Sequence, residues 1–243
     1  SYFAFPKLRW SFAHFRELVP TARISRGHGP VAELPLALRP DVAAVTFVPT
    51  GASKPENWVS AFDAIYGDAV LVLHKGRIVY ERYNGVMNRD QPHIAFSLTK
   101  SFFGTLAEMM IESGELDPQQ TVAHYLPDLA TSGFGNATVR QVMDMTTGLY
   151  YDEDYASPRS GVVAFGTAVG VMPPPPGYTG PATSADYLKT IRPEGTHGAR
   201  FLYQSVDTEV LGWIMARIAG KPAHQLLEER IFSKLGAEHD AAI

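Results

Sequence analysis

The 243-residue sequence contains no cysteine, and this absence excludes disulfide bonds, thiol catalysis and thiolate metal sites. Its eight histidines are scattered, with no pair spaced four residues apart, so we expect no zinc site. Neither sign of charge dominates, because 21 lysines and arginines face 25 aspartates and glutamates, a net charge of −4 without a basic block. We therefore expect no nucleic-acid partner.

Long hydrophobic runs are also missing. The longest apolar stretch, residues 162–172, includes two glycines and a threonine and is too short to cross a bilayer. The first twenty residues mix charges with aromatic rings and lack the apolar core of a signal peptide. Because the sequence does not begin with methionine, a leader could already have been removed. We expect a cytoplasmic protein without membrane contact, with periplasmic or secreted locations as alternatives.

Local patterns predict an α+β chain. Residues 1–60 are rich in proline and glycine and are predicted to form an N-terminal wrap, with a short strand over 42–48. Residues 69–83 are typical of a β-hairpin, since two apolar runs flank Lys75-Gly76. Residues 152–186, which include a tetraproline, are expected to form a long loop or flap. Apolar periodicity and end signals predict four helices, over residues 97–113, 139–145, 206–219 and 224–235.

A single hairpin makes a poor sheet, because three or more strands are normally needed for independent stability. We therefore expect residues 61–243 to form a partial domain whose remaining C-terminal strands lie outside this sequence. A C-terminal segment of the same protein would then be needed to complete the fold.

Ser97-Leu98-Thr99-Lys100, at the start of the first predicted long helix, carries the main chemical signal. Residues three apart share a helix face, about 5–6 Å apart between β-carbons, so the amine can approach the hydroxyl. Ser-x-x-Lys occurs in acyl-transfer enzymes, and the positive helix end could stabilise an oxyanion. With 14 serines and 7 lysines, chance gives about 0.4 such motifs. An N-cap serine followed by an exposed lysine is therefore an equal alternative.

Tyr203 precedes the helix predicted over residues 206–219 and could project into a cleft. A free tyrosine is a poor base at neutral pH, but a nearby lysine ammonium favours the phenolate. The hypothesis is that Tyr203 and Lys100 act on Ser97 as one coupled acid–base unit. The alternative is an ordinary half-buried tyrosine whose hydroxyl contacts water.

An acidic run, Asp152-Glu153-Asp154, has two interpretations. It binds a cation or the cationic end of a substrate, or it is a solvated acidic loop. The neighbouring Tyr150, Tyr151 and Tyr155 form a wall that packs on a ligand, or they are loop aromatics that pack on the core.

Together these residues resemble the serine β-lactamase and penicillin-binding protein family over most of residues 65–240. Four segments look like the framework of that family: residues 112–117, 125–127, 139–148 and 231–236. Within the family, the chain resembles 6-aminohexanoate-oligomer (nylon oligomer) hydrolases and family VIII-type carboxylesterases. Four segments carry that likeness: residues 10–20, 96–104, 151–155 and 203–213.

The resemblance implies a β-lactamase/transpeptidase-like fold, an antiparallel sheet flanked by helices plus a mainly helical subdomain. It implies Ser97 as nucleophile, Lys100 and Tyr203 as its activating pair, and Tyr155 as a substrate-side residue on a mobile loop. Ser205, also expected in the substrate site, stands where lactamases have the asparagine of Tyr-x-Asn, which argues against efficient lactam cleavage. The family's third motif, a Lys-Thr-Gly or His-x-Gly strand with the second oxyanion N–H, is absent. This chain alone is thus expected to lack a complete site.

The leading hypothesis is a serine hydrolase that cleaves amide or ester bonds of small linear substrates through an acyl-enzyme, without metal or cofactor. A β-lactamase or D-alanyl carboxypeptidase is the first alternative. A non-catalytic penicillin-recognising scaffold or sensor is the second. The expected partner is the small-molecule substrate, with a homodimer left open. The sequence also leaves open the natural substrate, the preference for amide or ester, and whether Lys100 or Tyr203 is the dominant base.

Overall fold

The computed structural model describes residues 2–243, which fall into two compact units. The first unit contains the residues up to Pro20, Pro30–Ile94 and Gly236–His239. The second contains Thr21–Gly29, Ala95–Leu235 and Asp240–Ile243. Residues before position 60 thus contribute to both units, and the division at residue 60 expected from composition stays a prediction.

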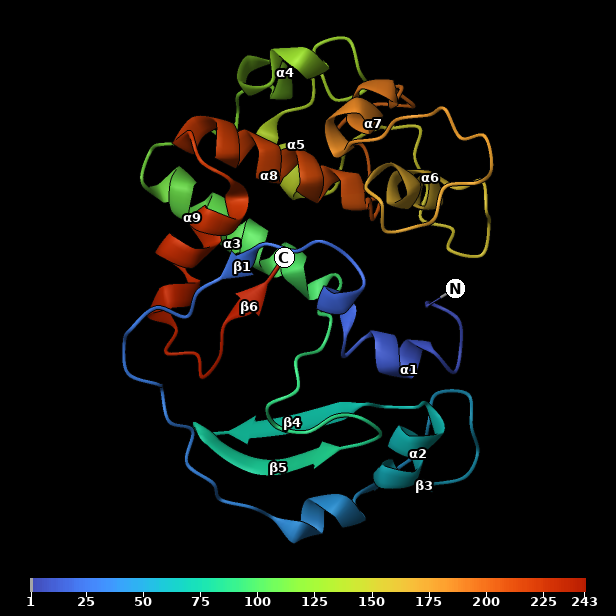
Figure 1. Ribbon diagram of the computed structural model, residues 1–243, viewed down its shortest axis with the longest axis vertical. Coiled ribbons are helices and arrows are strands. Elements are labelled where there is room, and N and C mark those ends of the chain that lie inside the picture. Colours follow the sequence, from blue (N-terminus) through green and yellow to red (C-terminus); the bar gives the residue numbers. More distant parts are fainter. Residues whose placement is uncertain (1) are drawn as a thin grey trace. The chain divides into compact units, whose positions relative to one another are not determined.

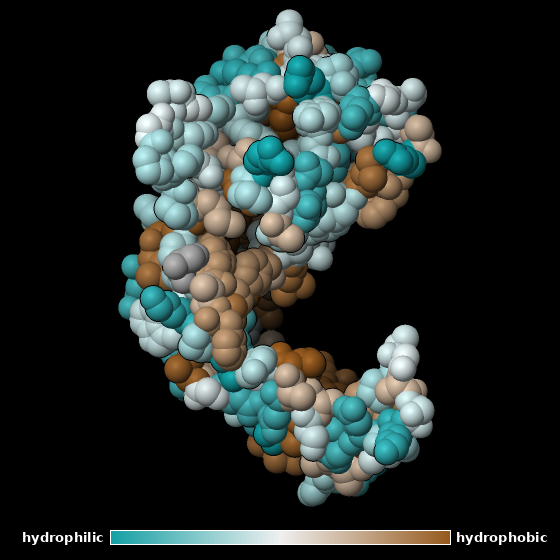
Figure 2. Space-filling model, turned by 90° about the vertical axis from the view of Figure 1, so that its right-hand side faces the viewer, coloured by the Kyte–Doolittle hydropathy of each residue, from teal (hydrophilic) through white to brown (hydrophobic). Residues whose placement is uncertain are grey.

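The first unit is built on the predicted hairpin, which is confirmed. β4 (Ala69–His74) pairs antiparallel with β5 (Arg77–Tyr83), as Figure 1 shows. Lys75 and Gly76 join the strands with φ of 50° and 73°, the positive values that a tight two-residue hairpin turn requires. β5 buries Ile78 and Val79, whereas the apolar side chains of β4 are largely exposed. Figure 2 accordingly shows hydrophobic surface on the unit that holds this hairpin.

Short elements complete the first unit. The strand predicted over residues 42–48 is only partly correct, because Pro40 starts a 3-10 helix there, as proline at a first helical position favours. Only Thr46 and Phe47 of that segment are in a strand, and they pair with Asn57 and Glu56. The elements are α1 (Leu8–Ser11), η1 (Phe15–Glu17), η2 (Pro40–Ala44), β2 (Thr46–Phe47), β3 (Glu56–Asn57) and α2 (Trp58–Ala64).

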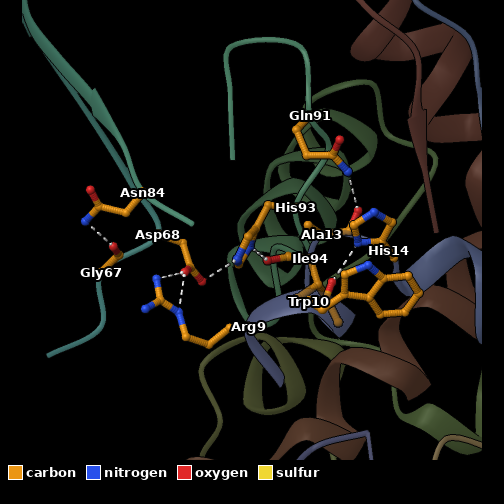
Figure 3. A network of polar contacts seen from close by, with 10 residues as sticks. All are labelled: Arg9, Trp10, Ala13, His14, Gly67, Asp68, Asn84, Gln91, His93 and Ile94. Carbon is orange, nitrogen blue, oxygen red and sulfur yellow. Dashed lines mark hydrogen bonds and ion pairs between the residues drawn. The ribbon is translucent and has the colours of Figure 1, made fainter. Parts of the chain in front are cut away.

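A polar network ties α1 and the start of β4 to the end of this unit (Figure 3). The Asp68 carboxylate accepts from Arg9 Nη2 at 2.9 Å and lies 3.2 Å from His93 Nε2. The backbone N–H of Ile94 donates to the Phe12 carbonyl at 2.8 Å. These contacts fix the chain shortly before it enters the second unit.

The second unit is mainly helical. Its one strand pair is antiparallel. No helix within residues 2–243 has both the length and the apolar character needed to cross a bilayer. The elements are β1 (Arg23–Ile24), α3 (Leu98–Glu112), α4 (Val122–Tyr125), η3 (Pro127–Leu129), α5 (Val139–Met143), α6 (Gly161–Ala168), α7 (Ser184–Thr190), α8 (Ser205–Ala219), α9 (Ala223–Arg230), η4 (Phe232–Lys234) and β6 (Ala241–Ala242).

The four predicted helices are confirmed as α3, α5, α8 and α9, and local end signals explain two of them. Thr138 and Gln141 form a reciprocal capping box at the start of α5. α8 ends at Gly220, whose φ of 65° is the left-handed conformation that glycine adopts without strain. The helix predicted over residues 224–235 is shorter than expected, since α9 stops at Arg230 and a 3-10 turn follows.

The prediction of one long loop over residues 152–186 is wrong. α6 begins in this segment after an N-cap serine, Ser160, whose hydroxyl accepts from the backbone N–H of Val163. α7 begins at its end after Thr183, which caps the helix in the same way. The tetraproline lies between these helices in irregular structure.

Packing of α3 against α8 positions the candidate site, because the first helix follows Ser97 and the second follows Tyr203. A glycine allows this packing, because a β-carbon on Gly212 of α8 would lie 2.7 Å from the Phe103 ring of α3. Figure 1 shows α8 crossing this unit beside α3 and α5. The fully buried side chains that surround the contact include Leu106, Met110, Leu126, Phe134, Val206, Val210, Ile214 and Met215.

Candidate active site

Ser97 stands at the N-terminus of α3 in a strained local setting. The residue before it, Phe96, has a φ of 45°, a left-handed conformation that costs a bulky residue about 1–3 kcal/mol. Ser97 occupies the N-cap position, yet its hydroxyl accepts no backbone N–H from the helix. The N-cap alternative therefore does not describe this serine, since its hydroxyl is left for other partners.

Those partners are the two residues singled out from the sequence. Lys100 Nζ donates to Ser97 Oγ at 3.0 Å, across one turn of α3. The Tyr203 hydroxyl lies 2.5 Å from the same Oγ and donates to it. Lys100 Nζ also lies 5.0 Å from the centroid of the Tyr203 ring. The three side chains thus converge on one oxygen.

The backbone of Tyr203 is held by segments on either side of it. Leu202 N–H donates to the carbonyl of Met145 at 2.8 Å, and the Ser205 N–H donates to Glu153 Oε1 at 2.5 Å. Tyr203 itself is 41% exposed, so its hydroxyl is accessible while its main chain is fixed.

Glu153 links the remaining two predicted residues. Its Oε1 accepts from the Ser205 N–H, and its Oε2 accepts from the Tyr155 hydroxyl at 2.7 Å. Partial desolvation and the Glu153 carboxylate raise the pKa of Tyr155 to about 12, with Tyr203 contributing to the rise. Tyr155 and Ser205 are therefore joined through a glutamate, and each is linked to Tyr203, Tyr155 by its electrostatic interaction and Ser205 by standing two residues further along the chain.

Glu153 is a residue of this site that the sequence did not predict. Neither interpretation of the acidic run, a cation site or a solvated loop, describes the contacts of Glu153. The flanking carboxylates serve the loop itself: Asp152 accepts from the Asp154 N–H, and Asp154 accepts from the Ala156 N–H. No cluster of metal-ligating side chains occurs among the residues that the structure describes. No sequence signal reveals the glutamate, because its partner Ser205 is 52 residues away.

Comparison with known proteins shows the family of the chain. The Beta-lactamase family model matches residues 56–242, so the chain belongs to the beta-lactamase family. The predicted β-lactamase/transpeptidase-like fold is confirmed by the same match and by solved structures.

Three relatives illustrate the likeness. The 6-aminohexanoate-dimer hydrolase of Paenarthrobacter ureafaciens is 34% identical over 98% of this chain, which covers 58% of that protein. A Bacillus anthracis structure provisionally named a 6-aminohexanoate-dimer hydrolase has a TM-score of 0.92 at 30% identity, covering 100% of this chain and 63% of that one. The hydrolase EstCE1, at 22% identity, TM-score 0.53 and coverage of 70% and 46%, shares the fold. The chain thus spans about three fifths of the length of the first two relatives.

Proposed function

We propose that the chain carries the nucleophile and its activating pair in a serine hydrolase that cleaves amide or ester bonds of small linear substrates. The observation that supports this most is the position of Ser97 Oγ, 3.0 Å from Lys100 Nζ and 2.5 Å from the Tyr203 hydroxyl. A serine hydroxyl is a weak nucleophile until a base removes its proton, and both candidate bases are within reach.

In the proposed acylation, the Ser97 proton passes to the coupled Tyr203–Lys100 unit as Oγ attacks the substrate carbonyl. Among the described residues, no acceptor takes the Ser97 backbone N–H, so it is available to the oxyanion at the positive end of α3. The acid–base unit then protonates the leaving amine or alcohol as the C–N or C–O bond breaks. In deacylation the same unit takes a proton from water as the water oxygen attacks the acyl carbonyl. When the bond between that carbon and Ser97 Oγ breaks, the unit passes the proton to Oγ and the carboxylic acid product leaves.

The relatives and two side chains support the proposed substrate class. A relative of the chain at 34% identity is a 6-aminohexanoate-dimer hydrolase, whose name denotes a linear amide. Ser205 replaces the asparagine of the lactamase Tyr-x-Asn motif, which favours a linear substrate over a lactam. Tyr155 is 67% exposed beside the centre, and we assign it to the substrate side.

A β-lactamase or D-alanyl carboxypeptidase activity is the second candidate, favoured by membership of the beta-lactamase family itself. A non-catalytic penicillin-recognising sensor is the third. The sensor differs in its kinetics, because it would acylate once and keep the adduct.

The test compares Ser97→Ala with Ser101→Ala in the natural full-length protein. Ser101 is the control because it is exposed on the same helix, one residue beyond Lys100. We expect Ser97→Ala to lose about 10³-fold or more of the hydrolysis of p-nitrophenyl acetate and 6-aminohexanoate dimer, and the control to retain it. Wild-type turnover by Ser97→Ala would exclude the proposed nucleophile.

Two further measurements separate the candidates. Preferential turnover of nitrocefin over the dimer and the ester would favour the lactamase. Mass spectrometry over time after mixing with the ester identifies the sensor by an adduct that persists. A transient adduct on Ser97 is the result expected for the hydrolase.

A further inference from the structure

A buried carboxylic acid lies two residues after the start of α8, the helix that follows Tyr203, and is unused by the proposed chemistry. Asp207, in the first turn of α8, has 0% exposed surface. Among residues 2–243, no lysine, arginine or histidine forms an ion pair with it. An ionised carboxylate in such a place is costly unless it is paired and fully hydrogen-bonded.

The contacts of Asp207 define its protonation state. Thr147 Oγ1 lies 2.8 Å and 2.9 Å from the two carboxyl oxygens of Asp207 and 2.8 Å from Gln204 Oε1. A threonine hydroxyl has one proton, so it cannot donate to three acceptor oxygens at once. With Asp207 ionised, the cluster would bring these oxygens together around a single proton.

The orientation of the Gln204 amide is also determined. Its Nε2 donates to the Tyr151 carbonyl at 3.3 Å, and a carbonyl only accepts, so Oε1 must face Thr147. If Asp207 is neutral, each link of the chain has one donor and one acceptor: Asp207 donates to Thr147, Thr147 to Gln204, and Gln204 to Tyr151. Burial independently raises the pKa of Asp207 well above its usual value, with the Thr147 hydrogen bond opposing the rise.

This chain of hydrogen bonds passes through Gln204, the residue that follows the candidate base Tyr203. Gln204 is extended, with φ −140° and ψ 112°, and its side chain is buried. Neighbouring side chains of an extended segment point to opposite sides. Anchoring Gln204 in the interior therefore directs Tyr203 outward, toward Ser97.

We propose that Asp207 is a positioning residue, a buried neutral acid that donates to Thr147 and, through Gln204, holds Tyr203 at hydrogen-bonding distance from Ser97. Its effect on turnover rests on the proposed function, whereas its neutral state does not. Asparagine keeps an N–H donor at this place and alanine removes it. The two replacements therefore give opposite expectations.

The experiment uses Asp207→Asn, Asp207→Ala and the surface control Asp144→Asn in the natural full-length protein. We expect Asp207→Asn to retain the rate of labelling by a fluorophosphonate, and Asp207→Ala to lose about 10- to 100-fold in kcat with KM little changed. Thr147→Ser should behave as wild type and Thr147→Val as Asp207→Ala. Equal losses of kcat in Asp207→Asn and Asp207→Ala would overturn the proposal that a neutral Asp207 acts as a hydrogen-bond donor.

Two readouts separate positioning from stability and from the proposed function. Leu226→Ala, in the core of α9, lowers stability without touching the chain of hydrogen bonds. If Asp207→Ala loses no more kcat than Leu226→Ala at equal loss of stability, positioning is refuted. At pH 7, the infrared band of a protonated carboxylic acid should be present in wild type and absent from Asp207→Asn. Its absence from wild type would overturn the proposal even if the protein proved to be no hydrolase.

Discussion

Replacing Tyr203 by phenylalanine removes one oxygen and little else. The ring can stay 5.0 Å from Lys100 Nζ, because that contact involves the ring face and not the hydroxyl. The hydroxyl leaves no buried group unpaired, since Tyr203 is 41% exposed, so the free energy of unfolding should change by less than about 0.5 kcal/mol. The variant therefore isolates the contact of 2.5 Å with Ser97.

A positioned proton acceptor contributes about 10²- to 10⁴-fold, which corresponds to about 3–5 kcal/mol of activation free energy. We expect the p-nitrophenol burst of Tyr203→Phe to slow by that factor at pH 7. Tyr150→Phe is the matched control, since Arg192 lies 5.5 Å from that ring and Tyr150 is exposed. A burst rate for Tyr203→Phe within about threefold of wild type would refute a role for the phenol in proton transfer.

Three further predictions concern stability. Gly212→Ala should lower the free energy of unfolding in urea by about 1–3 kcal/mol, because its β-carbon meets the Phe103 ring. Gly104→Ala, which has open space beside it, should raise the free energy of unfolding by about 0.5–1 kcal/mol. A stabilised Gly212→Ala would contradict the packing. Burial lowers the pKa of His197, so the unfolded chain binds its proton more tightly and stability should fall as pH drops below about 6.5. If the free energy of unfolding of His197→Gln fell with pH as steeply as that of wild type, this account would be wrong. The hydrogen bond with Arg230 lowers the pKa of Glu115 to about 2. The stability that Glu115 contributes should therefore be present above about pH 4.5 and be lost as pH falls toward 2. Thermal melts of Glu115→Gln and wild type across this pH range measure that contribution.

Local signals were enough for much of the fold. The hairpin at Lys75-Gly76 and the helix ending at Gly220 depend on residues adjacent in sequence, whose conformations a turn or cap dictates. α6 was missed because residues 162–169 are apolar on every side apart from one threonine, so no polar face marks a helical period.

The residues of the candidate site also divide into those that sequence spacing predicts and those that depend on distant partners. Ser97 and Lys100 are one helical turn apart, so their proximity could be predicted from spacing. Tyr203 could be put forward as their partner from its chemistry, and the family resemblance supported it, but spacing could not predict its proximity because it lies 106 positions from Ser97. Glu153 and Asp207 were not identified, because their roles depend on partners 52 and 60 residues away and on burial that composition does not reveal.

The 106 residues that separate Ser97 from Tyr203 have a consequence for how the site forms. Contacts of long sequence separation carry a loop-closure cost and form only when the intervening chain has collapsed. The nucleophile should therefore become reactive late in refolding, after secondary structure has appeared. A reagent that modifies Ser97 would then count correctly assembled molecules in a preparation, a quantity that circular dichroism overestimates.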